Sequence, residues 1–294
     1  MMNRRLFLGA LGALGLVRQS GETTAASRSA LESPFSLSPF PFPLLPHSPA
    51  LGIQLYAVRD ALDGDFEGTL TTLATIGYRE VEFAGLHGRP AAEVRALLDR
   101  LKLTAPSGHI SLDDLEQTFE TAVADAKALG HRWVIIPWLP EALRTIPGYT
   151  QVAERMSRLA PRLRQAGLRL GYHNHHFEFD RLGDGSTCGY DILLQRTAAA
   201  GVMMELDLFW IRKGGGDATD YFRRYPGRFR LAHVKDMAAD GSQVNVGDGV
   251  IAWPALLRTA RKAGVEHFFL EHDEPADQLA FARESYRYLS RQKF

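Results

Sequence analysis

A single (β/α)8 barrel over residues 51–294 is the fold that the sequence predicts. Short apolar runs alternate with amphipathic stretches eight times, and no long run of either kind interrupts the alternation. Strict alternation implies parallel strands joined by helical crossovers, and eight units in about 240 residues have the size of a TIM-type barrel. An open doubly wound sheet is the alternative, but no GxGxxG motif follows the first predicted strand.

The predicted strands are short apolar runs, each followed by one period of helical pattern. The strands cover residues 52–58, 80–84, 103–109, 133–138, 168–175, 202–210, 230–236 and 267–273. The helices cover residues 66–76, 91–101, 112–129, 149–166, 190–199, 218–225, 254–263 and 278–290. Pro90 suits a first helical turn, Ser111 with Asp114 resembles a capping box, and glycines at 130, 167 and 264 follow helix ends.

The composition narrows the class of protein. An apolar content of 45% and a charged content of 23% are ordinary for a folded globular chain, which excludes bulk disorder. The 34 basic and 34 acidic residues balance to zero, which argues against a nucleic-acid binder with a broad basic surface. One cysteine, Cys188, allows neither an internal disulfide nor a thiolate metal cluster. No apolar run reaches the roughly 18 residues of a transmembrane span.

Residues 1–30 have the features of an export leader. Arg4 and Arg5 are followed by Phe7 and Leu8 and then by a modest apolar stretch rich in glycine and alanine. This order is similar to that of twin-arginine leaders, so we expect the export machinery of that route as a partner and a periplasmic or otherwise exported location. Residues 31–50 contain six prolines and no helical or strand period, and they are expected to form a linker or an external strap.

Polar residues follow seven of the eight predicted strands. In a barrel of parallel strands the chemistry is expected at the carboxyl ends, where alternate side chains point inward. Only the strand over 133–138 ends without an ionisable group. The polar residues at the other ends are Gln54, Glu82, His109, His173, His175, Glu178, Glu205, Asp207, His233, Lys235, Glu271 and Asp273.

These residue types favour a cation site. Glu, Asp and His without paired cysteines make an oxygen-rich ligand set with one or two nitrogens, which suits one divalent ion: Mn²⁺, Mg²⁺, Co²⁺ or Zn²⁺. Such an ion can hold a carbonyl oxygen and a neighbouring hydroxyl oxygen, so a neighbouring carboxylate can remove a proton from the carbon beside the carbonyl and leave an enediolate. The residues at the site identify the enediolate intermediate better than they identify the product formed from it.

Five segments together resemble the xylose isomerase-like TIM barrels, the superfamily often called sugar phosphate isomerase/epimerase. They are HNHHFEF (173–179), MELDLFW (204–210), HVKD (233–236), VGDG (246–249) followed by Trp253, and LEHD (270–273). The resemblance covers residues 51–294 and implies one divalent ion held by Glu178, Asp207, His233 and Glu271. A histidine cluster precedes the glutamate of the fifth strand, so His173 and His175 are alternative ligands in place of Glu178.

The resemblance also implies roles in a sugar isomerase or epimerase. Glu178 and Glu271 would transfer protons on opposite faces of the sugar, and Lys235 would add positive charge beside the developing anion. Gln54, Glu82, His109, His173 and His175 are expected to contact the substrate, and Glu205 to be a buried ion-pair group. Export indicates an unphosphorylated sugar or a keto-glycoside, because phosphorylated sugars are cytoplasmic metabolites.

Three other functions fit parts of the pattern. A lyase or dehydratase acting on 3-keto-glycosides would use the same site and expel a β-oxygen substituent. A sugar-binding protein without turnover would keep the pocket but would need no opposed carboxylates. An endonuclease for abasic DNA would need extra ligands for several zinc ions and a basic groove, which the balanced charge disfavours.

Overall fold

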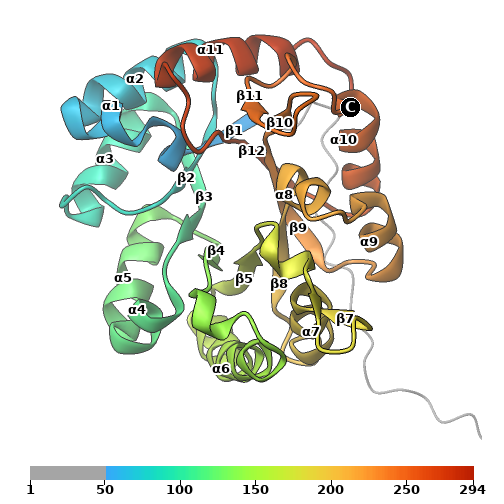
Figure 1. Cartoon of the computed structure of the whole chain (residues 1–294). Coiled ribbons are helices and arrows are strands. Elements are labelled where there is room, and N and C mark those ends of the chain that lie inside the picture. The colour runs from blue at the N-terminus through green and yellow to red at the C-terminus, as the bar shows by residue number, and fades with distance from the viewer. Residues whose placement is uncertain (1–50) are drawn as a thin grey trace, which may run out of the picture. The chain divides into compact units, whose positions relative to one another are not determined.

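The computed structural model describes residues 51–294 and confirms the predicted barrel. Eight parallel strands close on themselves in the order β1-β12-β9-β8-β5-β4-β3-β2, with helices around them (Figure 1). Each barrel strand pairs with the strands of the preceding and following units, as strands joined by right-handed crossovers do. The predicted leader and proline-rich segment lie outside the described residues.

The barrel strands agree with the predicted runs within a few residues at each end. They are β1 (Leu51–Gln54), β2 (Glu80–Phe83), β3 (Thr104–His109), β4 (Trp133–Ile136), β5 (Arg169–His173), β8 (Met203–Asp207), β9 (Phe229–Val234) and β12 (His267–Leu270). Two small hairpins lie outside the barrel sheet and were not predicted: β6 (Arg181–Leu182) with β7 (Thr187–Cys188), and β10 (Asp236–Met237) with β11 (Gln243–Val244).

The eight predicted helices are present in the structure. The helices are α1 (Arg59–Gly64), α2 (Phe66–Ile76), α3 (Ala91–Leu101), α4 (Leu112–Gln117), α5 (Phe119–Leu129), α6 (Ile146–Gln165), α7 (Gly189–Arg196), α8 (Leu208–Lys213), α9 (Ala218–Arg224), α10 (Trp253–Lys262) and α11 (Gln278–Leu289). Of these helices, α1 and α8 were not predicted. Short 3-10 turns are η1 (Leu55–Val58), η2 (Glu141–Leu143) and η3 (Phe177–Phe179). The single helix predicted over 112–129 is divided at Thr118, where α4 ends and α5 begins.

Two predicted strands end early because their last residues cap helical turns. The Gln54 side chain accepts a hydrogen bond from the Tyr56 amide at 3.0 Å, which starts η1 where a strand over 52–58 was expected. The Asp207 carboxylate accepts hydrogen bonds from the Phe209 and Trp210 amides at 2.9 and 2.7 Å, which starts α8 inside the run predicted over 202–210. Side-chain acceptors of this kind satisfy free amides at a helix start. The two capping residues, Gln54 and Asp207, are both among the polar residues at the strand ends.

Toward the amino ends of the strands, the barrel interior is filled by a small apolar cluster of Trp133, Ile135, Leu231 and Phe269. Gly52 and Gly171 make room for it, because a Cβ atom at either position would collide with the side chain of Phe269 or Ile135. His233 and Glu271 follow Leu231 and Phe269 by two residues and share their inward direction. The apolar cluster therefore fills the barrel interior on the amino-terminal side of the polar strand ends.

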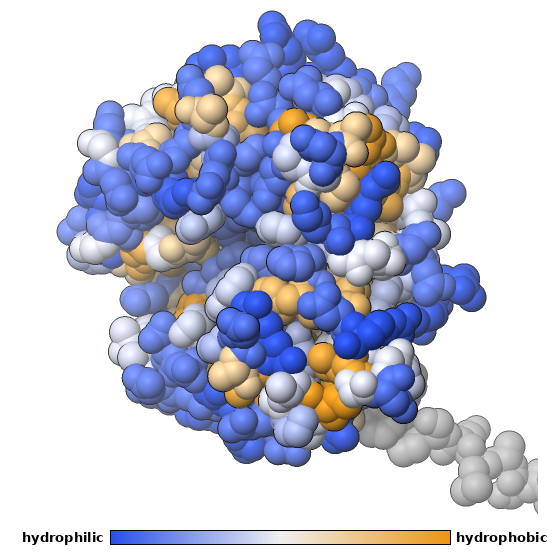
Figure 2. Space-filling model, in the orientation of Figure 1, coloured by the Kyte–Doolittle hydropathy of each residue, from blue (hydrophilic) through white to orange (hydrophobic). Residues whose placement is uncertain are grey.

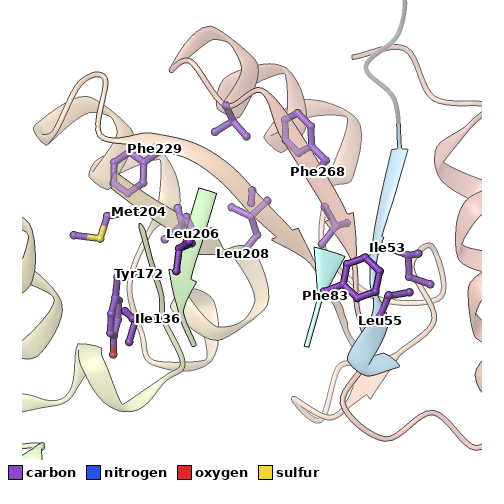
Figure 3. Packing of buried hydrophobic residues seen from close by; sticks show 14 of the residues in the cluster. Ile53, Leu55, Phe83, Ile136, Tyr172, Met204, Leu206, Leu208, Phe229 and Phe268 are labelled. Carbon is purple, nitrogen blue, oxygen red and sulfur yellow. The ribbon is translucent and has the colours of Figure 1, made fainter. Parts of the chain in front are cut away.

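A larger apolar core lies between the strands and the surrounding helices. Figure 3 shows part of it, with Phe83 beside Ile53 and Leu55, and Tyr172 beside Ile136 on neighbouring strands. Within residues 51–294, no helix is both long and apolar enough to cross a membrane.

Candidate active site at the carboxyl ends of the strands

His233 lies at the centre of a buried cluster of carboxylates and imidazoles. Its Nε2 atom is 2.6 Å from Oε2 of Glu82 and 3.2 Å from Oε2 of Glu205. Its Nδ1 atom is 2.6 Å from Oε2 of Glu271 and 4.0 Å from Oδ2 of Asp207. The imidazole therefore separates two pairs of carboxylates, one at each ring nitrogen.

On the Nε2 side, Glu82 accepts from several groups. The Gln54 amide donates to Oε2 of Glu82 at 2.8 Å, and His109 Nε2 lies 3.3 Å from the same oxygen. His109 Nε2 is also 3.0 Å from Oε2 of Glu205. Gln54, Glu82 and Glu205 are completely buried, whereas His109 is partly exposed. The second oxygens of Glu82 and Glu205 are buried and have no hydrogen-bond partner in the described part of the chain.

On the Nδ1 side, Lys235 forms ion pairs with three carboxylates. Its Nζ atom lies 3.2 Å from Oδ2 of Asp207, 2.8 Å from Oε2 of Glu271 and 2.8 Å from Oδ1 of Asp273. Gln243 of β11 fixes Asp273, since its amide donates to Oδ2 at 2.6 Å and its carbonyl oxygen accepts from the Asp273 amide at 2.9 Å. No sequence signal pointed to Gln243, because this contact depends on how the β10–β11 hairpin folds back.

Two overlapping groups in the cluster could hold a metal ion. One consists of His173, Asp207, His233 and Glu271, and the other of His109, His173, Glu205 and His233; the ligand atoms within each group lie within 4.8 Å of one another. The first group offers two nitrogens and two carboxylates, a set that suits Mn²⁺, Co²⁺ or Zn²⁺. Nδ1 of His173 is buried and has no hydrogen-bond partner among the described residues, and the buried Oδ2 of Asp207 accepts no hydrogen bond but meets Lys235 in an ion pair at 3.2 Å. Unsatisfied buried atoms are rare, so this group fits a cation.

Glu178 lies in neither group, contrary to the expectation from the sequence. Its Oε1 accepts from the Tyr172 hydroxyl at 2.6 Å, and its Oε2 accepts from the His175 amide at 2.8 Å. The turn η3 carries Glu178 into this pair of contacts and leaves His173, the last residue of β5, beside His233 with ring centroids 4.4 Å apart. The structure thus brings together three of the four expected ligands and puts His173, one of the alternatives, with them.

The buried charges shift one another's pKa. Burial acts to lower the pKa of His109, but Glu82 and Glu205 outweigh it and raise that pKa to about 9. The pKa of His233 is raised well above its ordinary value in the same way, mainly by Glu205 and Glu271. Burial opposes ionisation of Glu271, but Lys235 and His233 outweigh it and hold its pKa below the ordinary value. His109, His233 and Glu271 are therefore charged at neutral pH in the chain alone.

Three further groups respond mainly to burial itself. Burial raises the pKa of Asp207 to about 6 and that of Glu178 to about 7. Burial also lowers the pKa of His173 well below its ordinary value, which keeps this imidazole neutral. A neutral imidazole is the form that binds a metal ion.

Asp236 organises the loop that carries the VGDG motif. Its carboxylate accepts hydrogen bonds from the amides of Gly247 at 2.8 Å, Gly249 at 3.3 Å and Ile251 at 3.3 Å. Asp236 directly follows Lys235, so the same strand end positions the lysine and this loop. The motifs HVKD and VGDG, which the sequence showed as separate segments, form one structural unit.

Comparison with known families agrees with the fold and the motifs. The family model of xylose isomerase-like TIM barrels matches residues 70–292. The chain therefore belongs to this family, which confirms the resemblance. None of the curated proteins compared with the chain matches it.

Solved structures of the same fold include proteins described with different activities. A sugar phosphate isomerase/epimerase from Parabacteroides distasonis is 24% identical, with a TM-score of 0.73 over 83% of this chain and 94% of that one. An L-ribulose 3-epimerase is 15% identical, with a TM-score of 0.62 over 82% and 93%. A family 2 AP endonuclease from Brucella melitensis is 16% identical, with a TM-score of 0.63 over 82% and 99%. At these identities the likeness shows the fold, and the activity has to be argued from the site.

Proposed function

We propose that this protein is a divalent-metal-dependent sugar isomerase or epimerase that removes a proton from the carbon next to a carbonyl. The observation that carries the proposal is the convergence of His173, Asp207, His233 and Glu271 within ligand distance of one another at the carboxyl ends of four consecutive barrel strands. The buried Nδ1 of His173 has no hydrogen-bond partner among the described residues. A bound Mn²⁺, Co²⁺, Mg²⁺ or Zn²⁺ would act there as a Lewis acid on sugar oxygens.

His173 takes the ligand position that the sequence assigned to Glu178. Both oxygens of Glu178 are already used by Tyr172 and by the His175 amide. His173 has its Nδ1 free of hydrogen bonds and is neutral. In this proposal Glu178 supports the loop after β5 and does not transfer a proton.

Glu271 is the group that removes the proton, and its return by the same carboxylate to the neighbouring carbon isomerises the sugar, whereas epimerisation would need a second donor on the opposite face. It is 5% exposed, whereas Glu82, Glu205, Asp207 and Glu178 are completely inaccessible. Its lowered pKa keeps it ionised and able to accept a proton at a carboxylate oxygen. Lys235 Nζ, 2.8 Å from Glu271, supplies positive charge where negative charge develops on the substrate.

Gln54 and Glu82 act behind His233 in this proposal and do not reach the substrate. Both are completely buried, and Glu82 contacts His233 directly. His109 and His175 are partly exposed and keep the substrate-binding role expected for them. A neutral His175, whose pKa burial lowers to about 2, can donate or accept a hydrogen bond to a sugar hydroxyl.

The substrate we propose is an unphosphorylated sugar or keto-glycoside. Five carboxylates gather at the site, from Glu82, Glu205, Asp207, Glu271 and Asp273, and the lysine beside them already pairs with three of them. Among these carboxylates the lysine is therefore not free to clamp a phosphate dianion. Export through the twin-arginine route, which we propose from Arg4 and Arg5, supports the same substrate class. That route carries folded proteins, so the metal would be loaded in the cytoplasm.

Hydrogen exchange in D₂O tests the proposed reaction. Keto-sugars and 3-keto-glycosides are incubated with the protein and each of Mn²⁺, Mg²⁺, Co²⁺ and Zn²⁺, and deuterium at the carbon next to the carbonyl is measured by NMR. We expect metal-dependent exchange with at least one substrate, and its loss in Asp207→Asn, which keeps the cap of α8 but removes a charged ligand. Turnover without exchange or a primary isotope effect at that carbon would refute proton abstraction. Analysis of the product then distinguishes an isomerase or epimerase, which returns the proton, from a lyase, which expels a β-substituent.

A further inference from the structure

An exposed tryptophan contacts His175, a neighbour of the candidate ligand His173. Trp138 follows the carboxyl end of β4, the one predicted strand without an ionisable group at its end, and 48% of its surface is open to solvent. In the view of Figure 2, mostly hydrophilic residues surround a hollow near the middle of the molecule.

Neighbouring side chains hold the Trp138 indole in place. Its ring lies edge-to-face with His175 at 4.7 Å and with Phe177 at 5.0 Å between centroids. The Arg144 guanidinium carbon lies 4.7 Å from the centre of the indole and 3.5 Å from that of Phe177. Arg144 is itself fixed, because two of its nitrogens donate to the Leu139 carbonyl at 3.2 Å each. Trp138 is thus a preorganised platform, which loses little freedom when a ligand stacks on it.

A line of rings connects Trp138 to the candidate metal ligands. His173 and His175 have ring centroids 5.0 Å apart, and His175 and Trp138 follow at 4.7 Å. Trp138 therefore lies less than 10 Å from His173. A sugar ring at the cluster and a second ring joined to it through a glycosidic oxygen span this separation.

Two polar atoms near this line have no partner in the described part of the chain. They are Nδ1 of His175 and Nε1 of Trp210, both buried, and the two rings are 5.6 Å apart. An imidazole nitrogen and an indole N–H can bond to hydroxyl or glycosidic oxygens. Apolar faces combined with a few polar groups are typical of small-molecule sites.

We propose that Trp138, His175 and Trp210 form a subsite for the second ring of a glycoside whose reacting sugar lies at the cluster. This inference rests on the proposed function and narrows its substrate class from free sugars to glycosides. The second ring is an aromatic aglycone or a neighbouring sugar, and both present an apolar face to the indole. Lys235 does not attract an anion to this subsite, since it is paired with carboxylates of the cluster.

Binding of matched glycosides tests the subsite. Calorimetry on the full chain with Mn²⁺ compares the methyl and phenyl β-glycosides of glucose, galactose, mannose and xylose, with cellobiose as the disaccharide arm. For at least one sugar we expect the phenyl glycoside to bind about five- to tenfold more tightly than the methyl glycoside, as one aromatic contact provides. Trp138→Ala should abolish this preference and Trp138→Phe should keep most of it. Tighter binding of cellobiose than of methyl glucoside, lost in Trp138→Ala, would identify a sugar as the second ring.

Ile146→Ala is the matched control, because Ile146 is also an exposed apolar side chain (40%) and contacts none of the three subsite residues in the interactions described. It should keep the full phenyl preference. Equal affinities within every methyl–phenyl pair, or a preference that survives Trp138→Ala, would overturn the subsite. Deuterium exchange into free keto-sugars without any phenyl preference would overturn the subsite alone. A phenyl preference without exchange in any substrate would overturn the proposed reaction alone.

Discussion

The Nε2 atom of His233 lies 2.6 Å from Oε2 of Glu82, while the other ring nitrogen lies 2.6 Å from Glu271. The two carboxylates thus hold opposite edges of one imidazole. A carboxylate behind a metal-binding histidine fixes the orientation of the ring and raises the basicity of the nitrogen that binds the ion. Glu82 occupies that position here, with Nδ1 on the side of Asp207 and Glu271.

Replacing Glu82 by Gln should weaken Mn²⁺ binding by about 10- to 100-fold, the usual effect of losing a group that orients a ligand. Titration calorimetry measures the change. Glu80→Gln is the matched control, because Glu80 lies two residues earlier on β2 and pairs with His267 at 2.8 Å, away from the cluster. Equal affinities of Glu82→Gln and the wild type would show that His233 is positioned without this carboxylate.

Replacing His173 and replacing Glu178 should affect metal binding differently. His173→Ala should lower Mn²⁺ affinity by more than about tenfold, since a direct ligand contributes at least as much as the groups that orient it. Glu178→Gln should leave the affinity unchanged, because its contacts are Tyr172 and the His175 amide. The reverse result would restore Glu178 as the ligand expected from the sequence.

The metal-free protein should lose stability as the pH rises through 7, in part because of Glu178. Burial raises its pKa from 4.5 to about 7, so the folded chain binds this proton more tightly than the unfolded chain. The contribution is fully present below pH 4.5 and is lost as the pH rises through 7. Urea unfolding from pH 4 to 8 should therefore show a smaller decline for Glu178→Gln. A decline of the same size in both proteins would remove Glu178 as its cause.

Lys235→Met should separate catalysis from metal binding. Turnover should fall by about 10²- to 10³-fold because the positive charge beside the developing anion is lost. Mn²⁺ affinity should rise, because Lys235 competes with a cation for Asp207 and Glu271. Lys213→Met is the control, since Lys213 donates to the Gly241 carbonyl at the surface, away from the cluster. Full activity of Lys235→Met would exclude the lysine from the mechanism.

Replacing Arg4 and Arg5 together by lysine should retain the protein in the cytoplasm, because the twin-arginine receptor reads the arginine pair. Cell fractionation followed by immunoblotting measures the distribution. Normal recovery of the lysine variant from the periplasm would contradict the leader assignment. The location of the protein would then no longer support an unphosphorylated substrate. The five carboxylates at the site would still support it.

Much of the site could be predicted because local rules govern it. Inward-facing residues at strand ends recur every second position, so Asp207, His233 and Glu271 had to meet once the strands were parallel and adjacent. The motifs around them were specific enough to indicate the family. The barrel itself followed from the alternation of apolar runs and amphipathic stretches.

Other features depended on contacts that no local pattern encodes. The turn η3 after β5 decides that His173 and not Glu178 joins the cluster, and Tyr172 stabilises that turn through Glu178. The pairing of Glu82 with His233 joins residues 151 positions apart. The side chain of Gln243 reaches Asp273 only because a hairpin folds back over the strand ends. Strand periodicity determines which side chains face the barrel interior, but the partner that each one meets is decided by the closure of the barrel and the paths of its loops.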